Sequence, residues 1–157
     1  MHSTVDETKD ISPGQFQALS EFRYEIRKFL HFSESAARAV GLEPQQHQLL
    51  LAIKGFDGKD TGGPTIGYLA ERLQVRHHSA VELVDRMETR GMVKRRAGEQ
   101  DRRQVIVTLS DAGERILKDL AKQHIAEIQQ IGPGLVAALQ QVLASASYPR
   151  TGGLENP

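Results

Sequence analysis

Apolar residues in the first third of the chain recur at the spacing of an α-helix. Between about residues 15 and 40 they return every three or four positions and form one face. This face consists of Phe16, Leu19, Phe22, Ile26, Phe29 and Leu30. Gly41 is placed to end the helix, and Pro44 to begin a second one that reaches about Lys54. The second helix carries Leu49, Leu50, Leu51 and Ile53.

Two short helices joined by a tight turn are predicted in the middle of the chain. The first runs from Thr65, a good N-cap residue, to Leu73, and the second from about His77 to Arg90. Gly91 follows at the position where glycine commonly ends a helix. The apolar faces hold Ile66, Leu69, Ala70 and Leu73, then Ala80, Val81, Leu83, Val84 and Met87. This pairing is typical of a helix-turn-helix.

A β-hairpin is predicted next. Residues 92–96 form its first strand, 97–103 its polar tip and 104–109 its second strand. In the second strand the residues alternate at period two, with Val105, Val107 and Leu109 on one side and Ile106 and Thr108 on the other. A helix-turn-helix followed by a hairpin predicts a winged helix-turn-helix, here over residues 44–110.

A long region with apolar stripes follows the hairpin. Ser110 is suited to cap a helix over residues 111–131, and the Gly-Pro-Gly sequence at 132–134 is expected to break it. A last helix then carries the apolar stripe Leu135, Ala138, Leu139, Val142, Leu143 and Ala146. We expect a disordered N-terminal arm over residues 1–12 and a disordered tail over 148–157.

The predicted fold class is mainly α with a small β-hairpin wing, in a single domain over residues 13–147. The flanking helices, within 13–43 and 111–147, carry apolar stripes that a small winged domain cannot bury alone. A two-fold interface between two copies would cover these stripes, so we expect dimerisation helices and a homodimer. Packing of the same helices within one chain is the alternative.

The composition is that of a globular protein, with 25% charged and 39% hydrophobic residues. No apolar run is long enough to cross a bilayer, and the first ten residues lack the basic start and apolar core of a leader. We therefore expect a cytoplasmic protein with no membrane partner. The absence of cysteine excludes disulfides, Cys-ligated zinc and thiol-based sensing in this chain.

The net charge is zero, but the charges are unevenly distributed. Residues 72–103 contain nine Arg or Lys against five Asp or Glu, and a local basic surface of this kind binds anions. Residues in the first turns of a recognition helix can read base edges in the major groove. Here these residues are Arg76, His77, His78, Ser79 and Glu82. Arg86 is better placed for a phosphate, or for pairing with Glu82.

The tip of the hairpin carries a charge cluster where turns usually have small residues. A narrow minor groove attracts an inserted arginine, and a nearby carboxylate can hold its guanidinium in position. We therefore predict that Asp101 orients Arg103, while Arg102, Arg95 and Arg96 contact phosphates. A solvated loop without a binding role is the alternative.

The stretch over residues 65–113 resembles the MarR family of bacterial transcriptional regulators, and the likeness extends more weakly from Gln15 to the last helix. The matching features are Leu69-Ala70, Val84-Asp85-Arg86, Gly91, Val93, Arg95, Asp101-Arg102-Arg103, Val107, Leu109, Ser110 and Gly113. The resemblance implies a homodimer that binds a pseudo-palindromic operator in double-stranded DNA. By position it makes 76–86 the recognition helix and Asp101 with Arg103 the wing pair.

Three features depart from the family pattern. Arg76 stands where a small capping residue is usual, Glu82 where a polar or basic residue is common, and the His77-His78 pair is unusual. These departures leave the operator sequence unpredicted.

The resemblance also implies that a small aromatic or phenolic effector lowers the affinity for DNA. Its pocket would lie between the dimer helices and the DNA-binding region. Tyr24, Arg27 and His31 share one helical face and, together with His47, are the candidate ligand-binding residues. For His31, His47 and His124, burial with satisfied hydrogen bonds is the alternative.

Other classes of site and function find less support. His78 and Glu82 stand at i and i+4 and can face one metal ion, but without cysteine or a tighter cluster we predict no metal and no cofactor. Gly58-Lys59 resembles the end of a phosphate loop, yet Ile53 replaces the required glycine and Asp60 the required Ser or Thr.

The chain has no nucleophile elbow, no informative pair of carboxylates and no nucleotide fingerprint, so we predict no enzymatic activity. The predicted function is a sequence-specific DNA-binding regulator, expected to be a repressor. A winged helix that contacts only other proteins is the alternative, and it would not need the basic middle of the chain.

Overall fold

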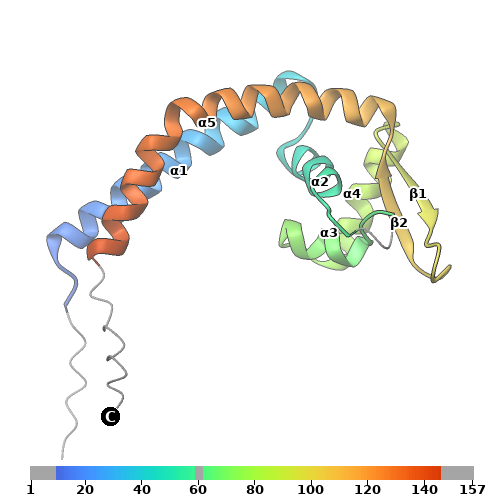
Figure 1. Ribbon diagram of the computed structural model, residues 1–157, viewed down its shortest axis with the longest axis horizontal. Helices are drawn as coiled ribbons and strands as arrows, with labels where there is room; N and C mark the ends of the chain where they lie inside the picture. The colour runs from blue at the N-terminus through green and yellow to red at the C-terminus, as the bar shows by residue number, and fades with distance from the viewer. Residues whose placement is uncertain (1–9, 59–61, 146–157) are drawn as a thin grey trace, which may run out of the picture. The chain divides into compact units, whose positions relative to one another are not determined.

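The computed structural model describes residues 10–58 and 62–145 and contains five helices and a two-stranded hairpin within them (Figure 1). The elements are α1 (Pro13–Ala39), α2 (Pro44–Lys54), α3 (Ile66–Leu73), α4 (His77–Thr89), β1 (Val93–Ala97), β2 (Val105–Leu109) and α5 (Asp111–Ser145). This order matches the predicted class, mainly helical with a hairpin wing. The predicted tail, and the predicted arm up to residue 9, lie outside the described residues.

The chain divides into two compact units. One unit comprises Met1–Leu30 and Glu127–Pro157, and therefore the outer parts of α1 and α5. The other comprises His31–Ala126, with α2, α3, α4, the hairpin and the inner parts of α1 and α5. The inner parts of both long helices thus belong to the same compact body as the helix-turn-helix.

Local signals end α1 and begin α2 within a few residues. Gly41 adopts a left-handed φ of +79°, and the Leu42 N–H donates to the Ala37 carbonyl at 3.0 Å, which closes the end of α1. Glu43 and Gln46 then form a capping box: the Gln46 N–H donates to the Glu43 side chain, and the Glu43 N–H donates to Gln46 Oε1 at 3.0 Å. The predicted α1–α2 boundary is confirmed.

The helix-turn-helix follows from similar local signals. Thr65 Oγ1 accepts from the Tyr68 N–H at 3.2 Å and begins α3, as predicted. Gln74 turns the chain with a left-handed φ of 54°, the only positive φ outside glycine in the described residues. Arg76 precedes α4 without a capping bond from its side chain, and Gly91, at φ +72°, ends the helix.

The core of the His31–Ala126 unit lies where α2, α3, α4, the hairpin and α5 meet. Its fully buried side chains include Leu42, Leu49, Leu50, Leu69, Val84, Met87, Val107 and Leu120. Each side chain of this size stabilises the fold by about 1.5–3 kcal/mol when it is removed from water. The apolar faces predicted for the two short helices are the faces that the structure buries.

The hairpin is buried on both faces at its centre. β1 pairs antiparallel with β2, with Arg95 opposite Val107, and the Val107 N–H donates to the Pro64 carbonyl at 3.0 Å on the other edge. Ile106 packs so closely on Gly63 that a Cβ there would lie 2.7 Å from Ile106 Cγ2. Ile106 and Val107 are therefore both fully buried, although they point to opposite sides of the strand.

The predicted break at residues 132–134 is wrong, because α5 continues through Pro133 to Ser145. A proline inside a helix removes one backbone hydrogen bond but does not have to end the helix if tertiary packing offsets the loss. Within this unit, Ala138 is buried, and a Cβ on Gly134 would lie 3.3 Å from Glu25 Oε2 of α1. The Gln15 side chain also donates to the Ser145 carbonyl at 3.0 Å. Contacts with α1 thus hold the helix beyond the proline.

Candidate nucleic-acid interface

One face of α4 is exposed near its N-terminus, while the opposite face of the helix is packed into the core. Arg76, His77, His78 and Glu82 are exposed, and Ser79 is half-buried. The Arg76 carbonyl accepts from the Ala80 N–H at 3.1 Å, but the Arg76 side chain makes no capping bond to the N–H groups at the start of α4. The predicted base-reading residues thus share one accessible end of the helix.

Backbone hydrogen bonds shape the tip of the hairpin. The Gly98 N–H donates to the Gln104 carbonyl at 2.9 Å, and the Gln104 N–H donates to the Asp101 carbonyl at 3.1 Å. Asp101 Oδ1 accepts from the Arg103 N–H at 2.9 Å. A Cβ at Gly98 would lie only 2.6 Å from the Asp101 carbonyl oxygen, so this tight tip requires glycine.

The expected ion pair between Asp101 and the guanidinium of Arg103 is not among the ion pairs of the described residues. Asp101 instead fixes the backbone of residue 103 through its N–H group. The prediction that Asp101 orients Arg103 therefore needs a correction, because the carboxylate constrains the loop from which the arginine projects rather than the guanidinium itself.

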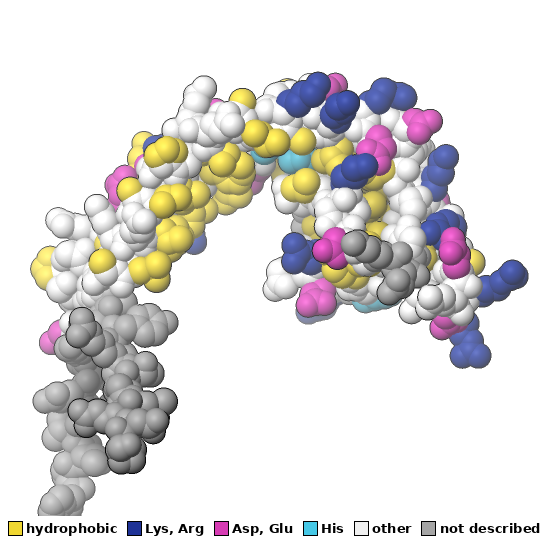
Figure 2. All heavy atoms as spheres, in the orientation of Figure 1, with side chains coloured by type: hydrophobic (Ala, Val, Ile, Leu, Met, Phe, Trp, Pro, Cys, Tyr) yellow, Lys and Arg dark blue, Asp and Glu magenta, His cyan; other side chains and the backbone are white. Residues whose placement is uncertain are grey.

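A groove of about 340 Å³ separates the start of the helix-turn-helix from the wing. His77 lies on the α4 side of the groove and Arg103 on the wing side. The lining residues are Thr65, Ile66, Gly67, His77, Arg103, Gln104 and Val105. Figure 2 shows several Lys and Arg side chains around the hairpin, some of them projecting at its tip. The structure thus brings together a histidine and an arginine that are separated by 26 positions in the chain.

The guanidinium of Arg95 is bonded to acidic residues of α4. Its Nη1 donates to Glu88 Oε1 at 2.9 Å, its Nη2 bonds Asp85, and its backbone N–H donates to Glu88 Oε2 at 3.1 Å. Burial opposes the charged form, but the bonds to Asp85 and Glu88 outweigh it and raise the pKa of the Arg95 guanidinium above its ordinary value. The Arg95 side chain thus joins the wing to α4, whereas the sequence predicts that it contacts a phosphate.

The other arginines of the wing and α4 differ in how accessible their side chains are. Arg96 is half-buried, lies 3.8 Å from Glu99 and packs against Gly62, where a Cβ would meet its Nη2 at 2.0 Å. Arg86 and Arg102 are exposed. Among the predicted phosphate contacts, Arg86 and Arg102 are therefore the most accessible.

Two histidines are buried together in the His31–Ala126 unit. The ring centroids of His47 and His124 are 4.8 Å apart, and His47 Nδ1 has no hydrogen-bond partner among the described residues. His124 Nδ1 must donate to the Leu120 carbonyl, at 2.7 Å, while its Nε2 bonds Ser33 Oγ at 2.8 Å. Burial, and then the nearby His124, lower the pKa of His47. Ser33 had no signal in the sequence that marked it.

Of the four candidate ligand-binding residues, His47 is buried, whereas Tyr24, Arg27 and His31 are exposed. The described residues contain no group of three or more His, Cys, Asp or Glu side chains arranged to hold a metal ion. No helix in the part of the chain that the structure describes is long and apolar enough to cross a membrane.

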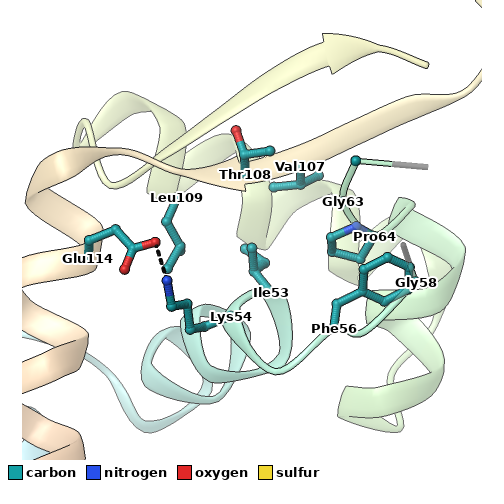
Figure 3. Close-up of a pocket in the computed structure, with 11 residues that line it drawn as sticks. Ile53, Lys54, Phe56, Gly58, Gly63, Pro64, Val107, Thr108, Leu109 and Glu114 are labelled. Atoms are coloured by element: carbon teal, nitrogen blue, oxygen red, sulfur yellow. Dashed lines mark hydrogen bonds and ion pairs between the residues drawn. The ribbon is translucent and has the colours of Figure 1, made fainter. Parts of the chain in front are cut away.

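A small opening lies beside the ion pair of Lys54 and Glu114, whose charged atoms are 2.8 Å apart (Figure 3). Its volume is about 220 Å³, and apolar side chains of Ile53 and Leu109 lie close to the pair. A second opening of about 380 Å³ shares Lys54 and Glu114. The second opening is further lined by Leu51, Leu117, Lys118 and Ala121. Neither opening includes the four candidate ligand-binding residues.

Comparison with known proteins finds a match to the region that contains α4 and the wing. Residues 40–104 match the sequence model of the MarR family, from the end of α1 through the tip of the wing. The resemblance read from the sequence is confirmed, and the exposed turn of α4 and the wing tip both lie within the MarR-family region.

A curated relative is a transcriptional regulator of the helix-turn-helix type. The chain is 33% identical over 104 residues to YcgE of Bacillus subtilis, an uncharacterized HTH-type transcriptional regulator. The match spans 66% of this chain and 64% of the length of YcgE.

Solved structures of MarR-family proteins have the same fold. The crystal structure of AbsC, a MarR family transcriptional regulator from Streptomyces coelicolor, matches with a TM-score of 0.70 at 20% identity, over 87% of this chain and 93% of AbsC. A mutant of MarR from E. coli, solved in complex with operator DNA, matches with a TM-score of 0.61 at 20% identity, over 80% of this chain and 90% of that one. The winged helix-turn-helix predicted from the sequence is confirmed by these likenesses.

Proposed function

We propose that this protein is a DNA-binding transcriptional regulator without enzymatic activity. The observation that carries the proposal is the groove between the exposed start of α4 and the wing, with His77 on one side and Arg103 on the other. A recognition helix in the major groove and a wing in the adjacent minor groove must leave room for the phosphate strand between them. A groove with Arg103 on one wall and the imidazole of His77 on the other suits that strand. The similar MarR mutant, solved with operator DNA, supports the same function.

In this proposal the residues of the site have different tasks. The N-terminal part of α4, with Arg76, His77, His78, Ser79 and Glu82, contacts base edges in the major groove. Arg103 enters the minor groove from a tip that Asp101 shapes, and Arg86, Arg96 and Arg102 neutralise phosphates. Arg95 joins the wing to α4 and contacts no phosphate.

Fluorescence anisotropy with a labelled duplex from the upstream intergenic DNA of the gene tests the proposal. We expect specific binding with an affinity that falls steeply with salt, by a slope of about −0.9 for each phosphate contact. Arg103→Ala is expected to weaken this binding by about 1–3 kcal/mol, or roughly 5- to 150-fold. Arg115→Ala, which removes an exposed arginine of α5 outside the groove, serves as the charge-matched control. Absence of binding at low salt would contradict the proposal and favour a protein-contact module.

The regulator is proposed to act as a homodimer on a pseudo-palindromic operator. Large apolar side chains in the unit formed by the outer parts of α1 and α5 are exposed, including Phe16 at 62% and Leu143 at 57% (Figure 2). A second copy that covers these side chains would remove them from water. Light scattering after gel filtration should give the mass of two chains. Leu143→Glu should shift the mass toward one chain, Gln140→Glu should not, and a monomeric wild type would contradict the dimer.

The proposed action is repression, modulated by a small aromatic acid. The opening of about 380 Å³ beside Lys54 and Glu114 supports this effector site better than the exposed Tyr24, Arg27 and His31, because it combines apolar side chains with a cation. Benzoate is a suitable probe, since its carboxylate can replace that of Glu114 at Lys54 while its ring contacts apolar side chains. We expect Lys54→Met to abolish a benzoate-dependent rise in the melting temperature. Lys122→Met should preserve the rise, and a promoter reporter measures the sign of regulation.

A further inference from the structure

Arg90, the residue that follows α4, bonds the corner between α1 and α2. Its Nη2 donates to the Gly41 carbonyl at 2.8 Å, and its Nη1 donates to Gln46 Oε1 at 2.8 Å. By the sequence alone, Arg90 is one of the nine basic residues of 72–103, the stretch expected to form an anion-binding surface. In the structure, however, both terminal nitrogens of its guanidinium already have partners within the protein.

The two partners belong to the most constrained part of that corner. Gly41 holds the left-handed turn that ends α1, and its carbonyl accepts one arm of the guanidinium. Gln46 is 8% exposed, and its Oε1 also accepts from the Glu43 N–H, which caps α2. A planar guanidinium presents its donors in a fixed fork, so both bonds together restrict the position of the end of α4. Gly41, Gln46 and Arg90 form what we call the corner bracket.

The corner bracket lies at the opposite end of α4 from the residues that read DNA. The 13 residues of α4 place its first residue about 18 Å from its last. Ala80, Val84 and Met87 pack α4 into the core along its length, so a small rotation of the helix about these contacts after loss of the bracket also displaces its first turn. Contacts to base edges tolerate displacements of only about 0.5 Å, whereas attraction to phosphates tolerates more.

We propose that Arg90 is a positioning residue that sets the tilt of α4 and thereby controls discrimination between operator and non-operator DNA. This inference rests on the proposed DNA-binding function. Arg90 acts through the α1–α2 corner, and it adds no contact with phosphate. Loss of either side of the bracket has the same consequence, although Gln46 is buried within α2 and Arg90 is exposed beside α4.

The test compares variants of both bracket residues by anisotropy on operator and on scrambled duplexes, over a range of salt concentrations. Arg90→Met and Gln46→Leu should each lower operator affinity by about 3- to 10-fold while affinity for scrambled DNA and the salt slope stay unchanged. The double variant should resemble either single variant, because each breaks the same bracket. Gln46→Glu keeps an acceptor for both Arg90 and Glu43, and it should retain wild-type discrimination.

Arg90→Lys separates the bracket from a phosphate contact. Lysine keeps the positive charge but cannot make the forked pair of bonds, so it should lose discrimination as Arg90→Met does. A phosphate contact would instead give near-normal binding by Arg90→Lys, a salt slope smaller by about 0.9 for Arg90→Met, and no effect of Gln46→Leu. Those results would overturn the inference, as would unchanged discrimination in both single variants.

Two controls keep these outcomes interpretable. Melting temperatures identify any variant that fails to fold, and the anisotropy comparison then uses Arg90→Lys and Gln46→Glu, which keep the charge of Arg90 or the acceptor on Gln46. Failure of the wild-type protein to bind operator DNA would contradict the proposed function itself. Normal wild-type binding with unchanged discrimination in the variants would contradict only the role of Arg90.

Discussion

Replacing Arg95 with methionine tests how the wing is attached to α4. The substitution keeps most of the aliphatic stem but removes the guanidinium that bonds Asp85, Glu88 and the Val81 carbonyl. The bond from the backbone N–H of residue 95 to Glu88 remains possible, since it does not need the side chain. The variant therefore isolates the contribution of the charged group.

The size of the effect follows from the exposure of the three side chains. Arg95 is 24% exposed, but Asp85 and Glu88 are 56% and 42% exposed, so water solvates both carboxylates once the guanidinium is gone. Ion pairs with exposed partners contribute about 0.2–1 kcal/mol each. Two such pairs and one weak bond to a carbonyl give a loss of about 1–2 kcal/mol in the free energy of unfolding. With a urea dependence of about 2 kcal/mol per molar, the midpoint should fall by about 0.5–1 M.

Urea unfolding followed by circular dichroism measures this loss, and Lys94→Met is the control. Lys94 is the exposed basic neighbour on β1, and no ion pair involves it among the described residues. Arg95→Met should lower the midpoint and Lys94→Met should not. An unchanged midpoint for Arg95→Met, together with a salt slope of DNA binding reduced by about 0.9, would refute the structural role and restore the phosphate contact.

Three further results are expected. Asp101→Ala should weaken operator binding measured by anisotropy, although it removes a negative charge near DNA, because the Arg103 N–H loses its acceptor; tighter binding would contradict this. Gly113→Ala should lower the melting temperature, since its Cβ would meet the Met92 carbonyl oxygen at 2.2 Å, whereas Gly132→Ala, with only Ile128 at 3.7 Å, should raise it. Because burial lowers the pKa of His47, the unfolded state binds a proton more readily than the folded state below about pH 6.5. The contribution of His47 to the free energy of unfolding is therefore fully present above that pH and falls below it, by at most about 1.4 kcal/mol per pH unit. Urea midpoints of His47→Leu should lack this part of the pH dependence.

Much of the candidate site could be predicted because it depends on short-range signals. Asp101 accepts from the N–H of Arg103, only two residues away, so this turn forms from neighbouring residues and does not depend on distant contacts. The exposure of the first turn of α4 follows from the helical period, since Ala80, Val84 and Met87 occupy the apolar face. The partners of Arg95 and Arg90 could not be predicted in the same way. Their acceptors lie 7 to 49 positions away in the sequence, and only the packing of α4 on its neighbours brings them within reach.

The sequence by itself determined the helices of the helix-turn-helix, their caps and the hairpin, because Thr65, Gly41 and Gly91 act through bonds and dihedral angles within a few residues. Tertiary structure decided three other features. It kept α5 helical through Pro133, packed Ile106 against Gly63, and used Arg90 and Arg95 to join α4 to its neighbours. Each of these depends on contacts between distant segments, whose free energy can exceed a local preference of about 1–3 kcal/mol. A basic stretch therefore marks where anions can bind, while the fold selects which cations remain available.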